Sequence, residues 1–159
     1  MELQSFLREA LKRAEHASTQ DEVPVGAVVV REGQIIGEGF NHRESDQNPV
    51  GHAEIKALQA AAKAIGSWRL VDCDLYVTLE PCPMCLAACQ QARIRRVIYG
   101  AKDEKGGALC LGFHVHDHPK LNHQFEVLYS PLEECSTILK EFFSRRRSEK
   151  KSAKLKDIS

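Results

Sequence analysis

The chain has 159 residues, of which 43% are hydrophobic and 28% charged, and its formal net charge at pH 7 is zero. A chain of this length buries enough surface to form one domain with its own core. No apolar run approaches the ~20 residues that cross a bilayer, and the first residues show no basic segment followed by an apolar stretch and a cleavage site. The composition therefore excludes a membrane protein and predicts a single-domain protein of the cytoplasm.

Charge is distributed unevenly along the chain. Residues 144–159 contain seven Lys or Arg and two Asp or Glu, whereas the other 143 residues contain 15 basic and 20 acidic side chains. A basic segment on an acidic body favours a polyanionic partner, and the alternative is a solvated end without a partner. We therefore divide the chain into one domain, residues 1–143, which includes most of the last helix, and a basic C-terminal tail, residues 144–159.

Periodicity and turn residues predict the secondary structure. In chain order we expect a helix from Leu3 to Ala14 and beyond, strands at 23–30 and 35–40 joined by a turn at 31–34, a polar loop at 41–51, and a helix from His52 to Ile65 that stops at Gly66. Then follow a strand at 75–79, a short helix from 81–83 to about 92, a strand at 93–99, a long loop at 101–124 with room for a short helical piece, a strand at 125–129 and, from Pro131, a helix of about fifteen residues.

This order of elements predicts the fold class. Strands that are followed by helices favour an α/β architecture, a three-layer α/β/α sandwich with a mixed five-stranded sheet. The strands after the first hairpin are expected to pair in parallel.

Two segments at predicted helix starts carry the chemistry: Gly51-His52-Ala53-Glu54 and Glu80-Pro81-Cys82-Pro83-Met84-Cys85. Two thiolates and one imidazole suit Zn²⁺, and three protein ligands leave a fourth position for water, whose pKa the metal lowers to about 7. We expect His52, Cys82 and Cys85 to hold Zn²⁺ and Glu54 to move protons between water and substrate. This spacing is the signature of the zinc nucleobase deaminases. His52 and Glu54 are two residues apart, so they can share a site only in the first turn of the helix.

Three simpler interpretations compete with a catalytic zinc. The Cys82–Cys85 pair could be a redox dithiol, but then the His-Ala-Glu segment would have no role. A closed structural zinc needs a fourth ligand, and Cys89 is the nearby candidate, although its depth in the helix suits a packed core thiol better. The third is a chance coincidence of both motifs.

A weaker motif is the alternating run His114, His116 and His118 in the long loop. It could bind a second metal, face a substrate or simply be solvated.

At these residues the chain resembles the bacterial tRNA-specific adenosine deaminases of the cytidine-deaminase-like superfamily. The likeness covers most of residues 5–147 and includes the segments 22–27, 36–41, 52–55, 75–82, 93–97, 100–103 and 121–123 and the pair Phe142-Phe143 with the arginines after it. The segment 107–113 departs from the usual family loop.

The resemblance implies a cytidine-deaminase-like fold and a homodimer that converts adenosine to inosine at the wobble position in the anticodon arm of a tRNA. It also implies substrate-binding residues. Asn41 would hydrogen-bond the flipped base, and Ala53 would lie at the substrate. Asp103 and Asn122 match positions near the flanking nucleotides, and Phe143, Arg146 and Arg147 match the RNA-facing element. The residues themselves leave simpler roles open: a turn for Asn41 and core packing for Phe143.

Two rival functions remain open. A deaminase of a free base or nucleoside, such as guanine or cytosine, would use the same metal chemistry. A silent RNA-binding module that keeps zinc only for folding would not need Glu54.

Overall fold

The computed structural model describes residues 2–158, with side chains for residues 3–156. Met1, the first residue of the predicted domain, and Ser159, the last residue of the predicted tail, lie outside the described residues. Five strands form one mixed sheet in the order β2-β1-β3-β4-β5. Their bounds are β1 Gly26–Arg31, β2 Gln34–Phe40, β3 Cys73–Val77, β4 Arg96–Tyr99 and β5 Glu126–Tyr129. The helices are α1 Glu2–Thr19, α2 Ala53–Ile65, α3 Pro83–Gln91 and α4 Glu133–Ile158, with a 3-10 turn, η1, at Val115–Asp117.

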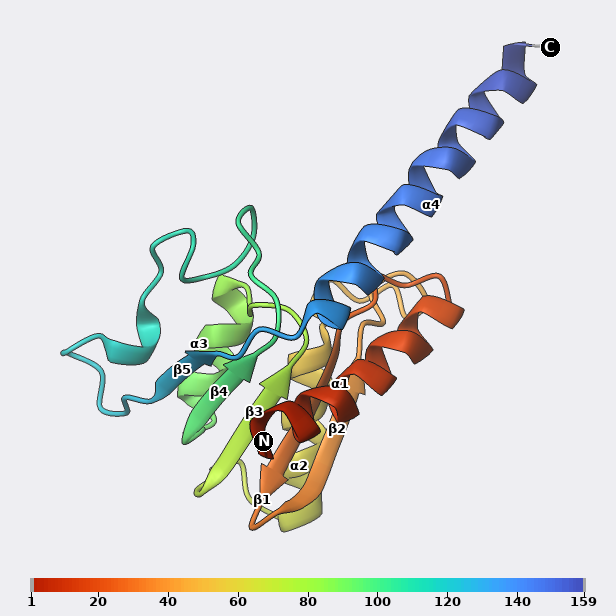
Figure 1. Ribbon diagram of the computed structural model, residues 1–159. Coiled ribbons are helices and arrows are strands. Elements are labelled where there is room, and N and C mark those ends of the chain that lie inside the picture. The colour runs from red at the N-terminus through yellow and green to blue at the C-terminus, as the bar shows by residue number, and fades with distance from the viewer. Residues whose placement is uncertain (1, 159) are drawn as a thin grey trace.

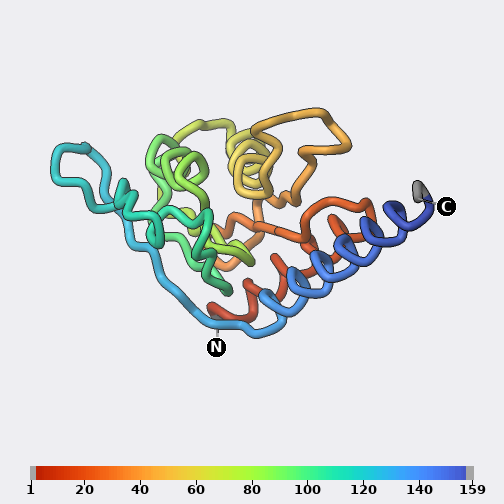
Figure 2. Tube along the Cα trace, turned by 90° about the horizontal axis from the view of Figure 1, so that it is seen from above, coloured from red at the N-terminus to blue at the C-terminus, as the bar shows by residue number. Residues whose placement is uncertain are grey.

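Helices cover both faces of the sheet, so the predicted three-layer α/β/α sandwich is confirmed. Figure 2 shows α2 and α3 on one side of the sheet and α1 and the start of α4 on the other. Strand residues alternate between these faces: Val29, Leu75 and Val97 join the core under α2 and α3. Val28 and Ile98 join the core under α1. Since both faces are buried, the strands are apolar at successive positions rather than at alternate ones.

Strand directions agree with the sequence-based expectation. β1 and β2 form the predicted antiparallel hairpin, and β1 also pairs antiparallel with β3. β3 pairs parallel with β4, and β4 pairs parallel with β5. The carboxyl ends of β2, β3 and β4 therefore meet at one edge of the sheet, which is where α/β proteins place their ligands.

Two glycines of β2 allow α2 to approach the sheet closely. A Cβ at Gly37 would lie 2.5 Å from the Ala57 carbonyl oxygen, and one at Gly39 would lie 2.4 Å from the Ala53 carbonyl oxygen. Only a residue without a side chain fits such contacts, and the alanines of α2 complete them. The start of α2, which carries His52 and Glu54, is thereby held directly against the sheet.

The last helix differs from the sequence-based expectation. Instead of about fifteen residues followed by a separate tail, α4 runs for 26 residues and includes the basic segment. The Lys, Arg, Glu and Ala residues after position 144 are good helix formers, and Arg145 lies 3.9 Å from Glu149 one turn on. Figure 1 shows α4 extending well beyond the body of the molecule. The domain boundary at residue 143 remains a prediction.

The segment 101–124 is the predicted long loop, and its short helical piece is η1. In Figure 1 its second half projects beyond the edge of the sheet at β5. None of the helices in the described part of the chain is both long and apolar enough to span a membrane.

Candidate active site

The loops that leave β2, β3 and β4 bring the predicted catalytic residues together at one edge of the sheet. His52 is the N-cap of α2, after the loop that follows β2. Cys82 is the N-cap of α3, after β3, and Pro83 fixes the first turn of that helix. Both helices therefore direct their positive N-terminal ends at the same point.

His52, Cys82 and Cys85 form one cluster that can hold a metal ion, as the sequence predicted. Their ligand atoms all lie within 4.8 Å of one another. The Nδ1 atom of His52 is 3.6 Å from the Cys82 sulfur and 3.4 Å from the Cys85 sulfur. Donors at these separations can share a single small ion, with the imidazole bound through Nδ1.

In the metal-free protein, the pKa of the Cys82 thiol is lowered and the pKa of the Cys85 thiol is raised. The Cys85 thiol donates a hydrogen bond to Cys82, which lowers the pKa of Cys82 to about 4. The same hydrogen bond, together with burial, raises the pKa of Cys85. Contact with Cys82 raises the pKa of His52. The pair thus already holds one thiolate, the form that binds metals.

Glu54 lies in the first turn of α2 beside this cluster, and its side chain is buried. Burial disfavours the charged form and raises the pKa of Glu54 to about 7. A carboxyl group with that pKa gains and loses a proton readily at neutral pH. The expectation that His52 and Glu54 can share a site only at the open end of the helix is met.

Cys89 is a core thiol in this structure. It is fully buried within the apolar cluster under α2 and α3, and burial raises its pKa. Within residues 2–158, the group of His52, Cys82 and Cys85 includes no fourth His, Cys, Asp or Glu ligand. All six cysteines are free. The site is therefore of the open, three-ligand kind that leaves a coordination position for water.

A cavity of about 170 Å³ opens directly onto the cluster. Its lining combines catalytic and polar groups with small apolar ones: Val23, Val25, Asn41, Arg43, His52, Glu54, Leu79, Glu80, Cys82 and Asp103. Arg43 and Glu80 were not among the site residues predicted from the sequence. Arg43 gave no signal because its loop has no regular pattern, whereas Glu80 adjoins the Pro-Cys motif and could have been noticed.

Glu80 is a buried carboxylate that fastens the loop after β4 over the pocket. It accepts hydrogen bonds from the backbone N–H groups of Asp103, at 3.2 Å, and Cys110, at 3.1 Å. The Cys110 thiol donates a third, at 3.1 Å. Gly107 makes room for this carboxylate, since a Cβ there would lie 2.0 Å from its Oε2. The pocket wall that carries Asp103 is thus positioned by Glu80.

Asn41, Ala53 and Asp103 lie at the pocket or directly behind it. The Asn41 side chain accepts a hydrogen bond from the Ala53 backbone N–H and donates one to the Val23 carbonyl. An amide carries two N–H donors, so one remains for a ligand. Asp103 lines the pocket, and its Oδ1 accepts the N–H of Gly106, at 3.0 Å.

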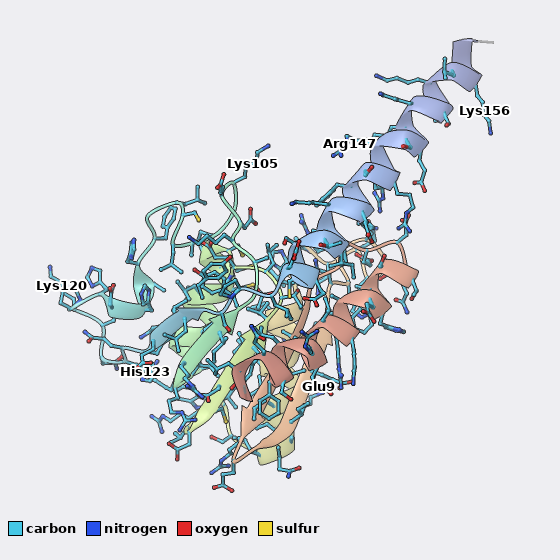
Figure 3. All side chains as sticks on the ribbon, viewed as in Figure 1. Glu9, Lys105, Lys120, His123, Arg147 and Lys156 are labelled. Carbon is cyan, nitrogen blue, oxygen red and sulfur yellow. The ribbon has the colours of Figure 1, made fainter. Side chains whose placement is uncertain are left out.

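The other predicted substrate residues lie away from the cavity. Asn122 is exposed in the projecting loop, and Phe143 is exposed on α4. Arg146 is held against the body, where its Nη2 donates to the Asp21 carbonyl at 2.6 Å. Arg147 is exposed and extends from α4 into solvent (Figure 3). The structure groups these positions on outer surfaces and not within the pocket.

Comparison with known proteins identifies relatives along nearly the whole chain. The profile of the MafB19-like deaminase family matches residues 1–147. The chain is 47% identical over 160 residues to a tRNA-specific adenosine deaminase of Haemophilus influenzae, covering 98% of this chain and 92% of that protein. It is 43% identical over 150 residues to a tRNA-specific adenosine deaminase of Bacillus subtilis, covering 94% of this chain and 93% of that protein.

Solved structures agree with these relatives. A chain from a study of A-to-I editing by tRNA:A34 deaminases at the wobble position of transfer RNA superposes with a TM-score of 0.80 at 43% identity, over 86% of this chain and 99% of that one. A guanine deaminase from Bacillus subtilis superposes with a TM-score of 0.61 at 34% identity, over 91% and 93%. The tRNA-editing structure is thus the more similar of the two by both measures.

Proposed function

The chain belongs to the MafB19-like deaminases and, among them, to the tRNA-specific adenosine deaminases, and on this basis we propose that it converts the wobble adenosine of a tRNA anticodon to inosine. The observation that carries the proposal is the buried Glu54 beside an open His-Cys-Cys cluster at the end of a small cavity. A base must leave its stack to enter such a cavity, as in other enzymes that act on nucleobases.

We infer that the metal is zinc. Sulfur at about 2.3 Å and nitrogen at about 2.0–2.1 Å from a tetrahedral zinc lie about 3.6 Å apart. The two S···N separations of 3.6 and 3.4 Å are close to that value. When bound, zinc supplies a water of lowered pKa as the source of the nucleophile.

Glu54 would perform the proton transfers of the reaction. Its carboxylate accepts a proton from the attacking water and delivers it to the ring nitrogen N1 of the adenine. The C6–O bond forms as N1 is protonated, and Glu54 then moves the second water proton to the departing amine as the C6–N bond breaks. The balance is adenosine plus water giving inosine plus ammonia, so no redox partner is needed. The pKa of about 7 at Glu54 matches this alternation.

Asn41 would orient the base. Its second N–H donor is unused within the described residues and can bind an acceptor on the purine edge. Ala53, whose N–H donates to Asn41, would act on the substrate through Asn41, and Asp103 would lie near a flanking nucleotide.

The RNA would extend from the pocket towards α4. Phe143, exposed by 44%, offers a stacking surface, and Arg147 offers a cation for phosphate. Asn122 and Arg146 are two further proposed contacts with the RNA. Arg146 must first release its hydrogen bond to the Asp21 carbonyl. A tRNA substrate is consistent with the predicted cytoplasmic location.

We also infer a homodimer, formed over the surface between α2 and α3. An apolar groove of about 400 Å³ lies there, lined by Ile55, Leu58, Gln59, Ala62, Trp68, Leu70, Ala88, Gln91 and Ala92. Trp68 at its rim is 58% exposed. An exposed apolar face with a large aromatic side chain is typical of a protein interface, and a second copy of the chain would cover it.

The test compares RNA with free bases. Purified protein is incubated with an anticodon stem-loop that carries adenosine at the wobble position, and separately with adenosine, guanine and cytosine. Inosine is expected in the RNA alone, and the Glu54→Ala variant gives the background rate. Release of ammonia from guanine, with unmodified RNA, would instead favour the free-base deaminase.

A further inference from the structure

Outside the active site, the structure brings three potential metal ligands together in the projecting loop. His114, His116 and Asp117 place one ligand atom each within 4.8 Å of the others. The rings of His114 and His116 lie 5.7 Å apart. His116 and Asp117 belong to η1, His114 is its N-cap, and η1 packs against α3 and β5; the group shares no member with the cluster at His52.

His116 is the anchored member of this group. Its side chain is only 12% exposed, and its ring contacts the buried Phe125 edge-on, with 6.1 Å between the ring centres. Its Nδ1 atom is buried and has no hydrogen-bond partner. Its Nε2 atom lies 3.8 Å from the Asp117 carboxylate, too far for a hydrogen bond. Within the described residues, neither ring nitrogen has a hydrogen-bond partner, which is uncommon for a buried polar group, and Nε2, on the side of Asp117, is the atom that can reach a ligand.

His114 and Asp117 complete the group from the solvent side. Both side chains are exposed, so they can rotate towards His116 without disturbing the core. Burial lowers the pKa of His116, although the Asp117 carboxylate opposes this effect.

We propose that His114, His116 and Asp117 form a second metal site, which binds a divalent transition-metal ion such as Zn²⁺, Ni²⁺ or Cu²⁺. Two imidazoles and one carboxylate suit this class of ion, whereas Mg²⁺ and Ca²⁺ prefer sites made of oxygen atoms alone. Ligands around such an ion lie about 3.3 Å apart, so the two exposed side chains need to close in by at most about 1.5 Å. Water fills the remaining positions.

An ion bound there would restrain the loop. Its three ligands come from one turn of the chain. This turn is already tied to the start of β5, since the Phe125 N–H donates a hydrogen bond to the His116 carbonyl, at 3.0 Å. The proposal is independent of the deaminase activity, since it requires none of the pocket residues.

Metal counting with matched histidine variants tests the site. The holoprotein, purified with its resident metal, is dialysed against micromolar ZnCl₂ and its zinc content per chain is measured by mass spectrometry. His114→Ala removes an exposed ligand. His118→Ala removes a histidine of the same loop that lies outside the cluster and accepts the Lys120 N–H at 3.2 Å. Circular dichroism confirms that each variant remains folded.

Wild type and His118→Ala should each take up one more ion per chain than His114→Ala. Titration should show at least a ~10-fold weaker second site in His114→Ala, because even outer-shell ligand partners are worth about 10–100-fold in affinity. Shifts of the His114 and His116 ring nitrogens in NMR spectra should accompany the uptake. Uptake by His114→Ala that equals the uptake of wild type or of His118→Ala would overturn the proposal. Because the difference between variants is the measured quantity, a missing ion at the catalytic cluster would not affect it.

Discussion

The Oδ1 atom of Asn41 accepts a hydrogen bond of 3.0 Å from the backbone N–H of Ala53. Ala53 stands between the predicted metal ligand His52 and the predicted proton carrier Glu54, at the first turn of α2. The side chain that is proposed to hold the base therefore also satisfies one of the free N–H groups at the start of that helix. Substrate recognition and the catalytic turn are physically connected through one amide.

Asn41→Ala should damage both functions of this amide. It leaves the buried Ala53 N–H without a partner and removes the proposed donor to the base. We expect about 1–3 kcal/mol lower stability in urea unfolding and a loss of about 10- to 100-fold in kcat/KM on the stem-loop. Unchanged activity in a correctly folded variant would remove Asn41 from the list of base contacts.

Glu54→Gln should abolish proton transfer while leaving the metal in place. The substitution keeps the size of the side chain but removes its titration, so kcat should fall by about 10²–10⁴-fold. Zinc content should match that of wild type, since Glu54 is not part of the ligand cluster. Cys82→Ala serves as the opposite case, with loss of the metal itself. A Glu54→Gln enzyme with most of its activity would contradict the assigned role.

The stability of the metal-free protein should depend on pH through Glu54. Burial raises the pKa of Glu54 from 4.5 to about 7. Because the folded pKa is the higher one, the folded state holds its proton more tightly than the unfolded state. The contribution of Glu54 to stability is therefore fully present below about pH 4.5 and is lost as pH rises through about 7, by about 3 kcal/mol.

The measurement is urea unfolding of wild type and Glu54→Gln at pH 5 and pH 8, both in the presence of a chelator. Glutamine does not titrate, so the variant should gain stability relative to wild type at the higher pH. Titratable groups remote from Glu54 are common to both proteins and cancel in the comparison, so the difference reports Glu54 together with the His52 and Cys85 groups that respond to its charge. A difference that is the same at both pH values would show that burial of Glu54 does not control this equilibrium.

Arg43→Ala should weaken RNA binding. Its side chain lines the pocket, and within the described residues it has no ion pair or hydrogen bond. If this guanidinium contacts a phosphate of the RNA, its removal raises KM and lowers the salt dependence of binding by about one unit of slope. The matched control is Lys12→Ala on α1, whose side chain is 64% exposed and pairs with Glu9. Equal effects of the two variants would indicate general electrostatics and no specific contact at Arg43.

Trp68→Glu should shift the protein from dimer to monomer. The substitution places a charge on the rim of the apolar groove between α2 and α3, where a second copy of the chain would cover it, and charged side chains are depleted from protein interfaces. Light scattering during gel filtration measures the mass. Leu111→Glu is the control, since Leu111 is also exposed, by 47%, but lies in the loop after β4. A dimer that survives Trp68→Glu would place the interface elsewhere.

The sequence by itself predicted the elements and the cluster that can hold a metal ion, because both depend on neighbours along the chain. Gly66 ends α2 in a left-handed conformation with φ of 68°, and Pro83 starts α3, as their residue types predicted. The His-x-Glu and Cys-x-x-Cys spacings are short enough that a single helix turn fixes their geometry. The predicted length of α4 was too short. The charge of the basic segment indicated a separate tail, whereas its Lys, Arg, Glu and Ala residues are good helix formers and continue the helix.

Only the tertiary structure decided which residues meet across long sequence separations. The Asn41 side chain bonds the Ala53 N–H, and Glu80 bonds the loop that carries Asp103. Arg43 lines the pocket, whereas Asn122 is not among its lining residues. These contacts arise where the carboxyl ends of β2, β3 and β4 meet at one edge of the sheet, a relationship that depends on strand order. Burial, which sets the pKa of Glu54 near 7 and isolates His116 against Phe125, likewise exists only once the chain has packed.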